Sequence, residues 1–193
     1  HLDDGERAES QLTRDQLAIA QKWNDGAATY TPPGHWNDIA TEYVSGARMT
    51  EVRAARVFAL LNMAMHDGGV GCWDAKFAWF NPRPSQLDPS IKTKIGLPNF
   101  PAYPSGHSTF SAAAAEVLSY LFPSGASSFA TMRDEAAISR LYGAIHYRSH
   151  IEEGKTRLTD ALGCTGGRHR PVVMSEQLAA WLRGRDFGPG AVF

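Results

Sequence analysis

The sequence has no apolar run long enough to cross a membrane. Its longest candidate, Val57 to Met65, is interrupted by Asn62 and preceded by Arg56, and a membrane-spanning helix needs roughly 18 or more apolar residues. This disfavours an integral membrane protein and predicts a soluble one without a membrane span. No signal-peptide pattern is present, but the chain starts at His1 rather than Met, so a secreted or periplasmic location stays open.

An excess of charge of one sign is also absent. The 19 Lys and Arg residues nearly balance the 20 Asp and Glu residues, which leaves a formal net charge of -1. Without a broad basic field, nucleic acid is not an expected partner. Any attraction for anions must therefore come from a local cluster of cations.

Cysteine is scarce, and repeats and low-complexity tracts are missing. Cys72 and Cys164 are isolated, so they form neither a disulfide framework nor a zinc site, and whether they pair is open. The 193 residues, 43% of them hydrophobic and 20% charged, suit one globular domain with its own core. We expect a flexible segment over residues 1–12 and a single domain over residues 13–193.

The spacing of apolar residues predicts an all-α protein, because no stretch alternates with the period of two that is typical of strands. Thr13 with Gln16 forms a capping box, and Thr50 and Ser105 are further N-cap candidates. After Thr50, Val52, Ala55, Ala59 and Met63 recur at helical spacing, and Leu60 and Ala64 widen the same face, which we expect to face the core. Loops are expected at Pro32-Pro33-Gly34 and over residues 84–104. The expected helices cover residues 15–24, 35–44, 51–68, 70–81, 105–121, 128–145 (as one or two helices), 149–162 and 175–182.

Two cations flank a group of large aromatic residues in the segment that ends at Pro84. Lys76 and Arg83 are seven residues apart, two helical turns, so they can face the same side. The surrounding aromatics indicate partial burial, and a buried cation needs a counter-anion. Arg offers a planar fork to an oxyanion and Lys a point charge. Taken alone, the pair is more typical of a solvated surface.

A second segment, Pro104-Ser105-Gly106-His107, has the features of an oxyanion site at a helix start. Ser105 caps the helix, Gly106 leaves room for close approach, and the first turn offers free N–H groups at the positive end of the helix dipole. His107 could transfer a proton beside a bound anion. Taken alone, this segment is equally typical of a simple capped helix.

The third segment contains Arg140 and His146, a further cation and a candidate nucleophile or metal ligand. The ordered set K-x6-R-P, P-S-G-H and S-R-x5-H resembles the signature of the superfamily that joins type 2 phosphatidic acid phosphatases, bacterial acid phosphatases and vanadium-dependent haloperoxidases. The resemblance covers residues 36–154 and implies a helical bundle of that type.

The resemblance also implies roles for the residues of the three segments. Lys76, Arg83 and Arg140 would hold the oxygens of vanadate or phosphate, and Ser105 and the Gly106 amide would donate further hydrogen bonds. His107 would be the acid and base. His146 would bind vanadium axially in a haloperoxidase, or attack phosphorus to form a phosphohistidine in a phosphatase.

Two aromatic residues favour the haloperoxidase branch. Trp73 and Phe100 look like the aromatic pair near the halide site of chloroperoxidase-type members, which implies halide and hydrogen peroxide as substrates. Plain core packing explains the same residues. A soluble acid phosphatase acting on phosphate monoesters is the close alternative. The short chain leaves room for a homodimer in which a partner subunit supplies part of the scaffold.

One position departs from the family pattern, because His150 stands where the third motif normally has Asp. In the family, that Asp is thought to orient the nucleophilic His. Losing a carboxylate of this kind typically lowers activity on the order of tenfold to a hundredfold. We expect weak phosphatase turnover and a smaller effect on vanadate binding. An oxyanion-binding relative with little catalysis is therefore a further alternative.

Two readings of a different kind compete with these. His146, His150 and Glu153 lie at helical spacing and could hold a divalent metal, although this leaves the three cations unexplained. A non-enzymatic interaction module would leave the whole cluster without a role.

Overall fold

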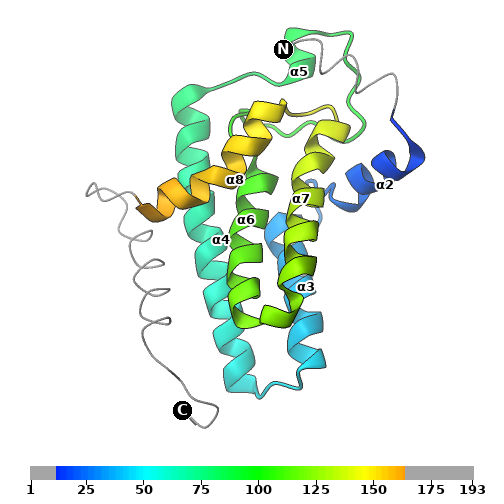
Figure 1. Cartoon of the computed structure of the whole chain (residues 1–193). Helices are drawn as coiled ribbons and strands as arrows, with labels where there is room; N and C mark the ends of the chain where they lie inside the picture. The colour runs from blue at the N-terminus through cyan, green and yellow to red at the C-terminus, as the bar shows by residue number, and fades with distance from the viewer. Residues whose placement is uncertain (1–11, 164–193) are drawn as a thin grey trace.

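The computed structural model describes residues 12–163, and every regular element in this range is helical (Figure 1). The expected all-α class is confirmed. The flexible segment expected over residues 1–12 falls almost entirely outside the described residues, as do Cys164 and the helix expected over residues 175–182. The elements are α2 (Arg14–Lys22), α3 (Thr31–Gly46), α4 (Glu51–Trp79), α5 (Pro84–Leu87), α6 (Gly106–Leu121), the 3-10 turn η1 (Pro123–Gly125), α7 (Ala126–Tyr142) and α8 (Arg148–Gly163).

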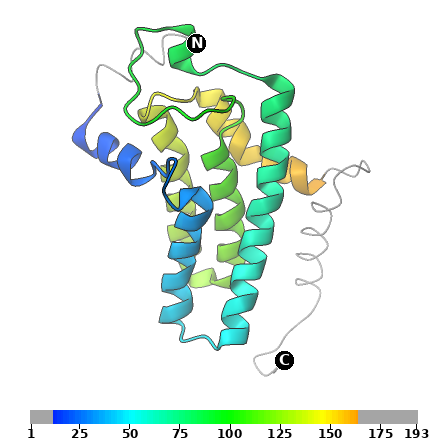
Figure 2. The same ribbon diagram turned by 180° about the vertical axis from the view of Figure 1, so that it is seen from behind.

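Four long helices, α3, α4, α6 and α7, run alongside one another and form the body of the molecule (Figures 1 and 2). The central helix is α6, which contacts α3, α4, α7 and α8. At one end of the bundle the start of α6 lies near the ends of α4 and α7, and α2, α5 and the loop that follows α5 lie there as well (Figure 1). That end contains the candidate site.

Local capping signals explain where several helices begin. The Thr13 side chain accepts from the Gln16 amide, and the Gln16 side chain accepts from the Thr13 amide, so the capping box is present. Ser105 caps α6 by accepting from the Ser108 amide. Thr50 precedes α4 as predicted, but its side chain makes no capping hydrogen bond.

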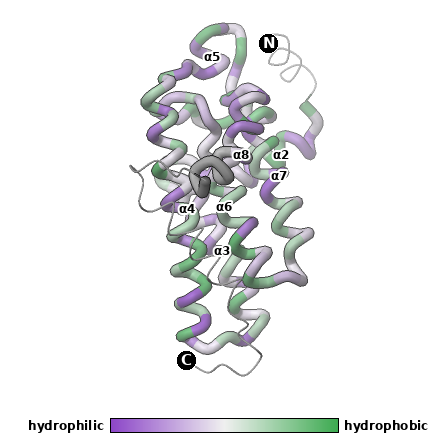
Figure 3. The backbone as a smooth tube through the Cα atoms, turned by 60° about the vertical axis from the view of Figure 1, so that its left-hand side comes forward, coloured by the Kyte–Doolittle hydropathy of each residue, from purple (hydrophilic) through white to green (hydrophobic). Residues whose placement is uncertain are grey.

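The core lies between α6 and its neighbours. Ala113 and Ala114 are fully buried, and side chains this small let the neighbouring helices approach α6 closely. Trp36 is also fully buried and satisfies its ring nitrogen by donating to Ser111 Oγ at 2.9 Å. Hydrophobic and hydrophilic residues alternate along each helix, as burial of one side requires (Figure 3).

Two interruptions of helical structure that the sequence predicts, at Pro32-Pro33-Gly34 and at Gly68-Gly69, are not found. Pro32 and Pro33 belong to the first turn of α3, where a missing N–H costs nothing. Gly68 and Gly69 lie inside α4, which runs unbroken for 29 residues. A Cβ atom on Gly68 would come within 3.3 Å of Thr109, and one on Gly69 within 3.0 Å of the Phe110 ring. These glycines therefore permit close helix packing instead of ending the helix.

The predicted core face of α4 was wrong except at its edge, where Ala64 is buried. The buried residues of α4 also include Val57, Leu61 and Met65, whereas Val52 and Met63 on the opposite side are 68% and 41% exposed. Both sides carry apolar residues at helical spacing, so periodicity alone could not choose between them. The segment around Lys76 and Arg83 is partly buried as expected: both cations are buried, whereas the aromatics Phe77, Trp79 and Phe80 are exposed. No helix among the described residues has the length and apolar character needed to cross a membrane.

Gly154 on α8 packs against the start of α6. A Cβ atom there would lie 2.7 Å from the Ser105 carbonyl oxygen and 2.7 Å from Ser108 Cβ, and backbone cannot move aside as a flexible side chain can. We expect Gly154→Ala to lower the free energy of unfolding by about 1–3 kcal/mol, as overpacking does, measured by urea unfolding. Gly46→Ala is the control, because nothing lies within 4 Å of its Cβ position. Equal stabilities of the two variants would contradict this packing.

Candidate functional site

The start of α6 is the base of the candidate site. Ser105 is fully buried, and its own amide donates to the His150 carbonyl at 2.9 Å, which ties α6 to α8. A Cβ atom on Gly106 would lie 3.3 Å from the Trp73 ring. Gly106 therefore lets the first turn of α6, with its outward-pointing N–H groups, lie directly against α4.

Lys76 in the last turn of α4 is fully buried and faces the loop before α6. Its ammonium donates to the carbonyl oxygens of Pro101 at 2.9 Å and Ala102 at 3.2 Å, and also to that of Pro104. The ammonium also lies over the rings of Trp73 and Phe100, at 5.5 and 5.2 Å from their centroids. These contacts fix the loop against α4.

Arg83 follows α4 and is 1% exposed. Its Nη1 donates to the Ile145 carbonyl at 3.0 Å and lies 2.9 Å from His146 Nε2, and its Nη2 donates to the Phe100 carbonyl at 3.1 Å. Its Nε is buried without a hydrogen-bond partner. Arg83 thus connects the loop before α6 to the segment that contains His146.

Arg140 lies in the last turn of α7 and is 1% exposed. Its Nε donates to Ser139 Oγ at 2.9 Å, and its two terminal nitrogens donate to the carbonyl oxygens of Asn24, Ala20 and Trp23. Asp25 is close enough for its charge to raise the pKa of Arg140. The guanidinium therefore holds the end of α2 against α7.

The three cations lie together without a carboxylate at ion-pair distance in the part of the chain that the structure describes. Burial is the main cause that lowers the pKa of Lys76 to about 8, that of Arg83 to about 10 and that of Arg140 to about 9. All three groups stay charged at pH 7. The result is a buried positive cluster whose charge is offset by backbone carbonyl oxygens.

His146 lies in the turn between α7 and α8, not within a helix with His150. Burial, then the charges of Arg83 and Lys76, lower its pKa well below the usual range, so its ring is neutral at pH 7. Its Nε2 faces Arg83, and its Nδ1 is buried without a hydrogen-bond partner.

His150 does not replace the missing carboxylate by a hydrogen bond. Its ring meets the His146 ring edge-on, with 5.8 Å between centroids, and it also packs against the rings of Tyr103 and Tyr147. Burial lowers the pKa of His150 to about 4, so it too is neutral at pH 7. Its Nδ1 has no partner.

His107 in the first turn of α6 has a side chain that is 15% exposed. Burial, and then the charge of Arg140, lower its pKa well below the usual range. Its Nε2 lies 3.7 Å from Asp25 Oδ2, beyond hydrogen-bond distance. A bound anion would raise this pKa and let the ring hold a proton.

A cavity of about 750 Å³ opens beside this cluster. Its wall includes Gly106, His107, Arg140, His146 and Trp73. The cavity therefore gives a ligand access to both histidines and to Arg140. Lys76, Arg83 and Ser105 are not part of its lining and lie behind it.

Asp25 and His35, for which the sequence shows no functional pattern, also shape the site. The Asp25 side chain is 3% exposed, and both its oxygens lie 3.1 Å from His35 Nδ1. Asp25 directly follows the helix expected over residues 15–24, and nothing local in the sequence connects it to His107 or Arg140. The expected site residues Trp73 and Phe100 form an aromatic pair with centroids 5.0 Å apart.

The alternative of a divalent-metal site at His146, His150 and Glu153 gains no support. Among the described residues, no group of three His, Cys, Asp or Glu side chains is placed to hold a metal ion. Because His146 precedes α8 instead of lying on it, the helical spacing assumed for that alternative does not apply.

A search of solved structures finds a vanadium-dependent iodoperoxidase, described as the first from a bacterium. It is 28% identical, has a TM-score of 0.76, and the match covers 90% of this chain and 48% of that one. The described residues therefore have the helical fold of this vanadium haloperoxidase.

Comparisons of sequence give a different set of relatives. Curated nucleotide-binding proteins match short stretches: that of Symbiobacterium thermophilum is 46% identical over 50 residues, 25% of this chain and 17% of that protein. That of Desulforapulum autotrophicum is 52% identical over 64 residues, 32% of this chain and 22% of that protein. The chain thus spans less than a quarter of either relative. Residues 82–190 match the family model of the RapZ C-terminal domain. Since this match takes in more than half of the chain, the protein belongs to the RapZ C-terminal domain family.

Proposed function

We propose that this protein is a vanadate-dependent haloperoxidase-like enzyme, which oxidises halide with peroxide at a site built for a tetrahedral oxyanion. The observation that supports this most strongly is the buried positive cluster of Lys76, Arg83 and Arg140 around His146, to which no carboxylate of residues 12–163 comes within ion-pair distance. Buried charge of one sign calls for an oppositely charged ligand. The fold shared with the iodoperoxidase supports the same proposal.

The donor set suits an oxyanion. Arg83 Nε, His107 Nε2 and Ser108 Oγ are buried polar atoms without partners, and Gly106 provides a close approach to backbone N–H groups. Arg83 and Arg140 would hold the anion with the Ser105 hydroxyl and the Gly106 amide, Lys76 would add its charge, and the His146 ring would supply the ligand to vanadium. Vanadate, when bound, supplies the centre that activates peroxide. Small molecules would reach it through the cavity.

The protein's own groups are in the protonation states that this chemistry needs. His146 is neutral at pH 7 because of burial and the neighbouring cations, which leaves its ring available as a ligand or a nucleophile. His107 lies on the cavity wall and is neutral without a bound anion. A bound anion would raise its pKa, so the ring could then accept a proton from a substrate and later pass it on.

Hydrolysis of phosphate monoesters is the close alternative. In that reaction His146 attacks phosphorus, the P–O bond to the leaving group breaks, and His107 protonates the leaving oxygen. Water then attacks the phosphohistidine, with His107 accepting its proton, and the N–P bond breaks to release phosphate and free His146. Three cations can stabilise the negatively charged oxygens of vanadate or of a phosphoryl group equally well. The unpartnered Nδ1 of His146 favours the haloperoxidase, since a developing imidazolium needs a carboxylate that His150 does not supply. Anion binding with little catalysis is the remaining alternative.

Nucleotide binding is a second candidate function that the comparisons favour. Several matched relatives are named nucleotide-binding proteins, and a nucleotide's phosphate is itself a tetrahedral oxyanion. The family match over residues 82–190 includes Arg83, Arg140 and His146. A cavity of about 750 Å³ is large enough for a ligand of that size.

The first test is a vanadate titration of the full chain by calorimetry, followed by assays for halide oxidation with peroxide and for phosphate-ester hydrolysis. We expect vanadate to bind and to start halide oxidation, and His146→Ala to lose that oxidation. His66→Ala is the matched control, because His66 is 72% exposed and outside the site.

Other outcomes select between the alternatives. Hydrolysis that proceeds without vanadate and is inhibited by it would identify a phosphatase. Vanadate that binds without either reaction would identify a binding protein, and displacement of vanadate by a nucleoside triphosphate would identify a nucleotide site. No binding of vanadate would overturn the oxyanion site itself.

Anion affinity should depend on the charge of Lys76. The pKa of Lys76 is lowered to about 8 by burial, so its ammonium is protonated and charged below pH 8 and loses that charge as the pH rises above 8. Sulfate is a suitable probe because it stays a dianion over this range. We expect its affinity to fall about tenfold from pH 7 to pH 9 in calorimetric titrations. Lys76→Met should bind more weakly at pH 7 and show a shallower decrease, and identical profiles would contradict the assignment.

Restoring a carboxylate beside His146 should raise hydrolysis. In His150→Asp, an oxygen can accept from His146 Nδ1 and stabilise the imidazolium. We expect turnover of p-nitrophenyl phosphate to rise about tenfold to a hundredfold. His150→Asn has the same shape without the charge and should give a smaller rise. Equal turnover in the two variants would show that the charge is not what this position lacks.

A further inference from the structure

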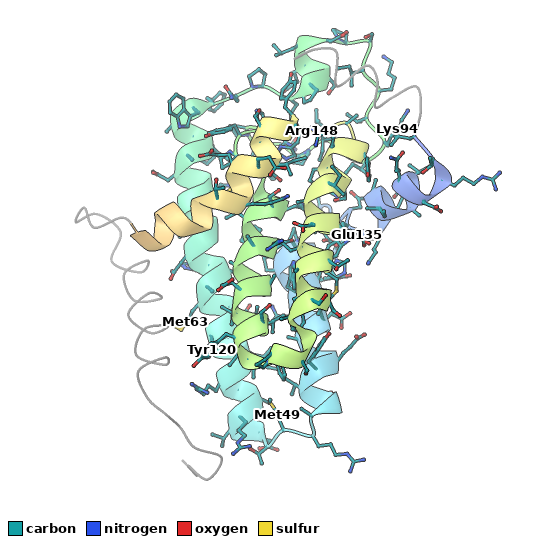
Figure 4. All side chains as sticks on the ribbon, in the orientation of Figure 1. Met49, Met63, Lys94, Tyr120, Glu135 and Arg148 are labelled. Atoms are coloured by element: carbon teal, nitrogen blue, oxygen red, sulfur yellow. The ribbon has the colours of Figure 1, made fainter. Side chains whose placement is uncertain are left out.

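The outward side of α4 carries an apolar stripe that no described element covers. Val52 is 68% exposed, Met63 41%, Val70 37% and Phe77 60%, and Ala59 between them is also exposed. Met63 lies at the outer edge of α4 in Figure 4. An exposed helix face of a monomer is normally polar, so a stripe along the whole helix indicates an interaction surface.

The spacing of the stripe is that of a helix-to-helix seam. Val52 and Ala59 are seven residues apart, and so are Met63 and Val70, and Val70 and Phe77. Two such series offset by three or four residues form one face in a helix that packs against another helix. At a rise of 1.5 Å per residue, the seam from Val52 to Phe77 is about 38 Å long.

We propose that this stripe is the interface of a homodimer, in which α4 packs antiparallel against α4 of a second copy. When the exposed His66 is counted with the stripe, positions 52, 59, 63, 66, 70 and 77 have the same spacing from either end. In an antiparallel pair centred between Met63 and His66, Val52 meets Phe77 of the second copy, and Ala59 meets Val70. A two-fold interface requires this kind of self-complementarity.

Charges beside the stripe fit the same arrangement. Arg56 and Asp74 are both exposed, and neither forms an ion pair among the described residues. In the antiparallel pair, position 56 meets position 73 of the second copy, which places Arg56 within one residue of its Asp74. The symmetry forms this contact twice. A parallel pair would instead bring Arg56 next to Arg56 and Asp74 next to Asp74.

A groove next to the stripe gives room for the second copy. Its volume is about 600 Å³, and its lining includes Met65, His66, Val70, Trp73 and Phe110. Met63 of the second copy would lie opposite His66, at the edge of this groove. The seam is only about one helix wide, roughly 10 Å, so it lies at the lower end of stable interface sizes. We expect a dissociation constant in the micromolar range.

The test is sedimentation velocity of the full chain over a wide range of concentrations. We expect a reversible dimer, and we expect Met63→Glu and Val70→Glu to shift it to monomer at every concentration measured. Leu87→Glu is the matched control: Leu87 is 59% exposed on α5, away from the stripe, and the variant should still dimerise. Circular dichroism of each variant checks that the fold is retained.

Charge-reversal variants distinguish an antiparallel α4 pair from any other partner bound to the stripe. Arg56→Glu and Asp74→Arg should each weaken the dimer about tenfold, and the double variant should restore it. A wild-type monomer at all concentrations would overturn the proposal, as would a dimer that Met63→Glu leaves intact. A monomer in which residues 164–193 cross-link to α4 would identify those residues as the occupant and also overturn it. None of these outcomes depends on the reaction at the oxyanion site.

Discussion

Burying three cations next to one another is the constraint on which the rest of this structure depends. Lys76 is satisfied by the carbonyl oxygens of Pro101, Ala102 and Pro104, and Arg83 by those of Phe100 and Ile145. The prolines in this loop have no N–H group, so the loop has more carbonyl oxygens than donors of its own. A long irregular segment thereby becomes a fixed wall of the site, because its unpaired acceptors surround a charge.

The directions of the helices suit the same constraint. Lys76 and Arg140 lie in the last turns of α4 and α7, where the negative end of the helix dipole stabilises a cation. The first turn of α6 points its positive end and its free N–H groups to the same place. An anion at the start of α6 would complete this arrangement of charges. The helix dipoles therefore provide part of the electrostatic stabilisation of an anion at this site, and the cationic side chains provide the remainder.

Structural features that depend on residues close in the sequence, such as helix caps, can be predicted from the sequence. Features that depend on packing between distant segments, such as the buried face of a helix, cannot. Thr13 and Ser105 cap helices because each cap is closed by a residue three positions later. The core side of α4 could not be chosen, because Val57 and Leu61 on one side and Val52 and Met63 on the other are similar in pattern. The three motifs identify residues that the fold brings together. Asp25 escapes notice because its link to Arg140 and His107 exists only after folding.

The cations and the helix dipole favour any tetrahedral oxyanion, so they do not select a reaction. What distinguishes the reactions is the ring of His146 and the atoms around its Nδ1. A nucleophile that becomes an imidazolium needs an acceptor there, and His150 offers only the edge of a neutral ring. A histidine that binds a metal centre would keep its neutral form, which the lowered pKa of His146 favours, and would need only a fixed orientation. An imidazole at position 150 would therefore disfavour a His146 nucleophile more than a His146 ligand, while leaving the buried cations in place.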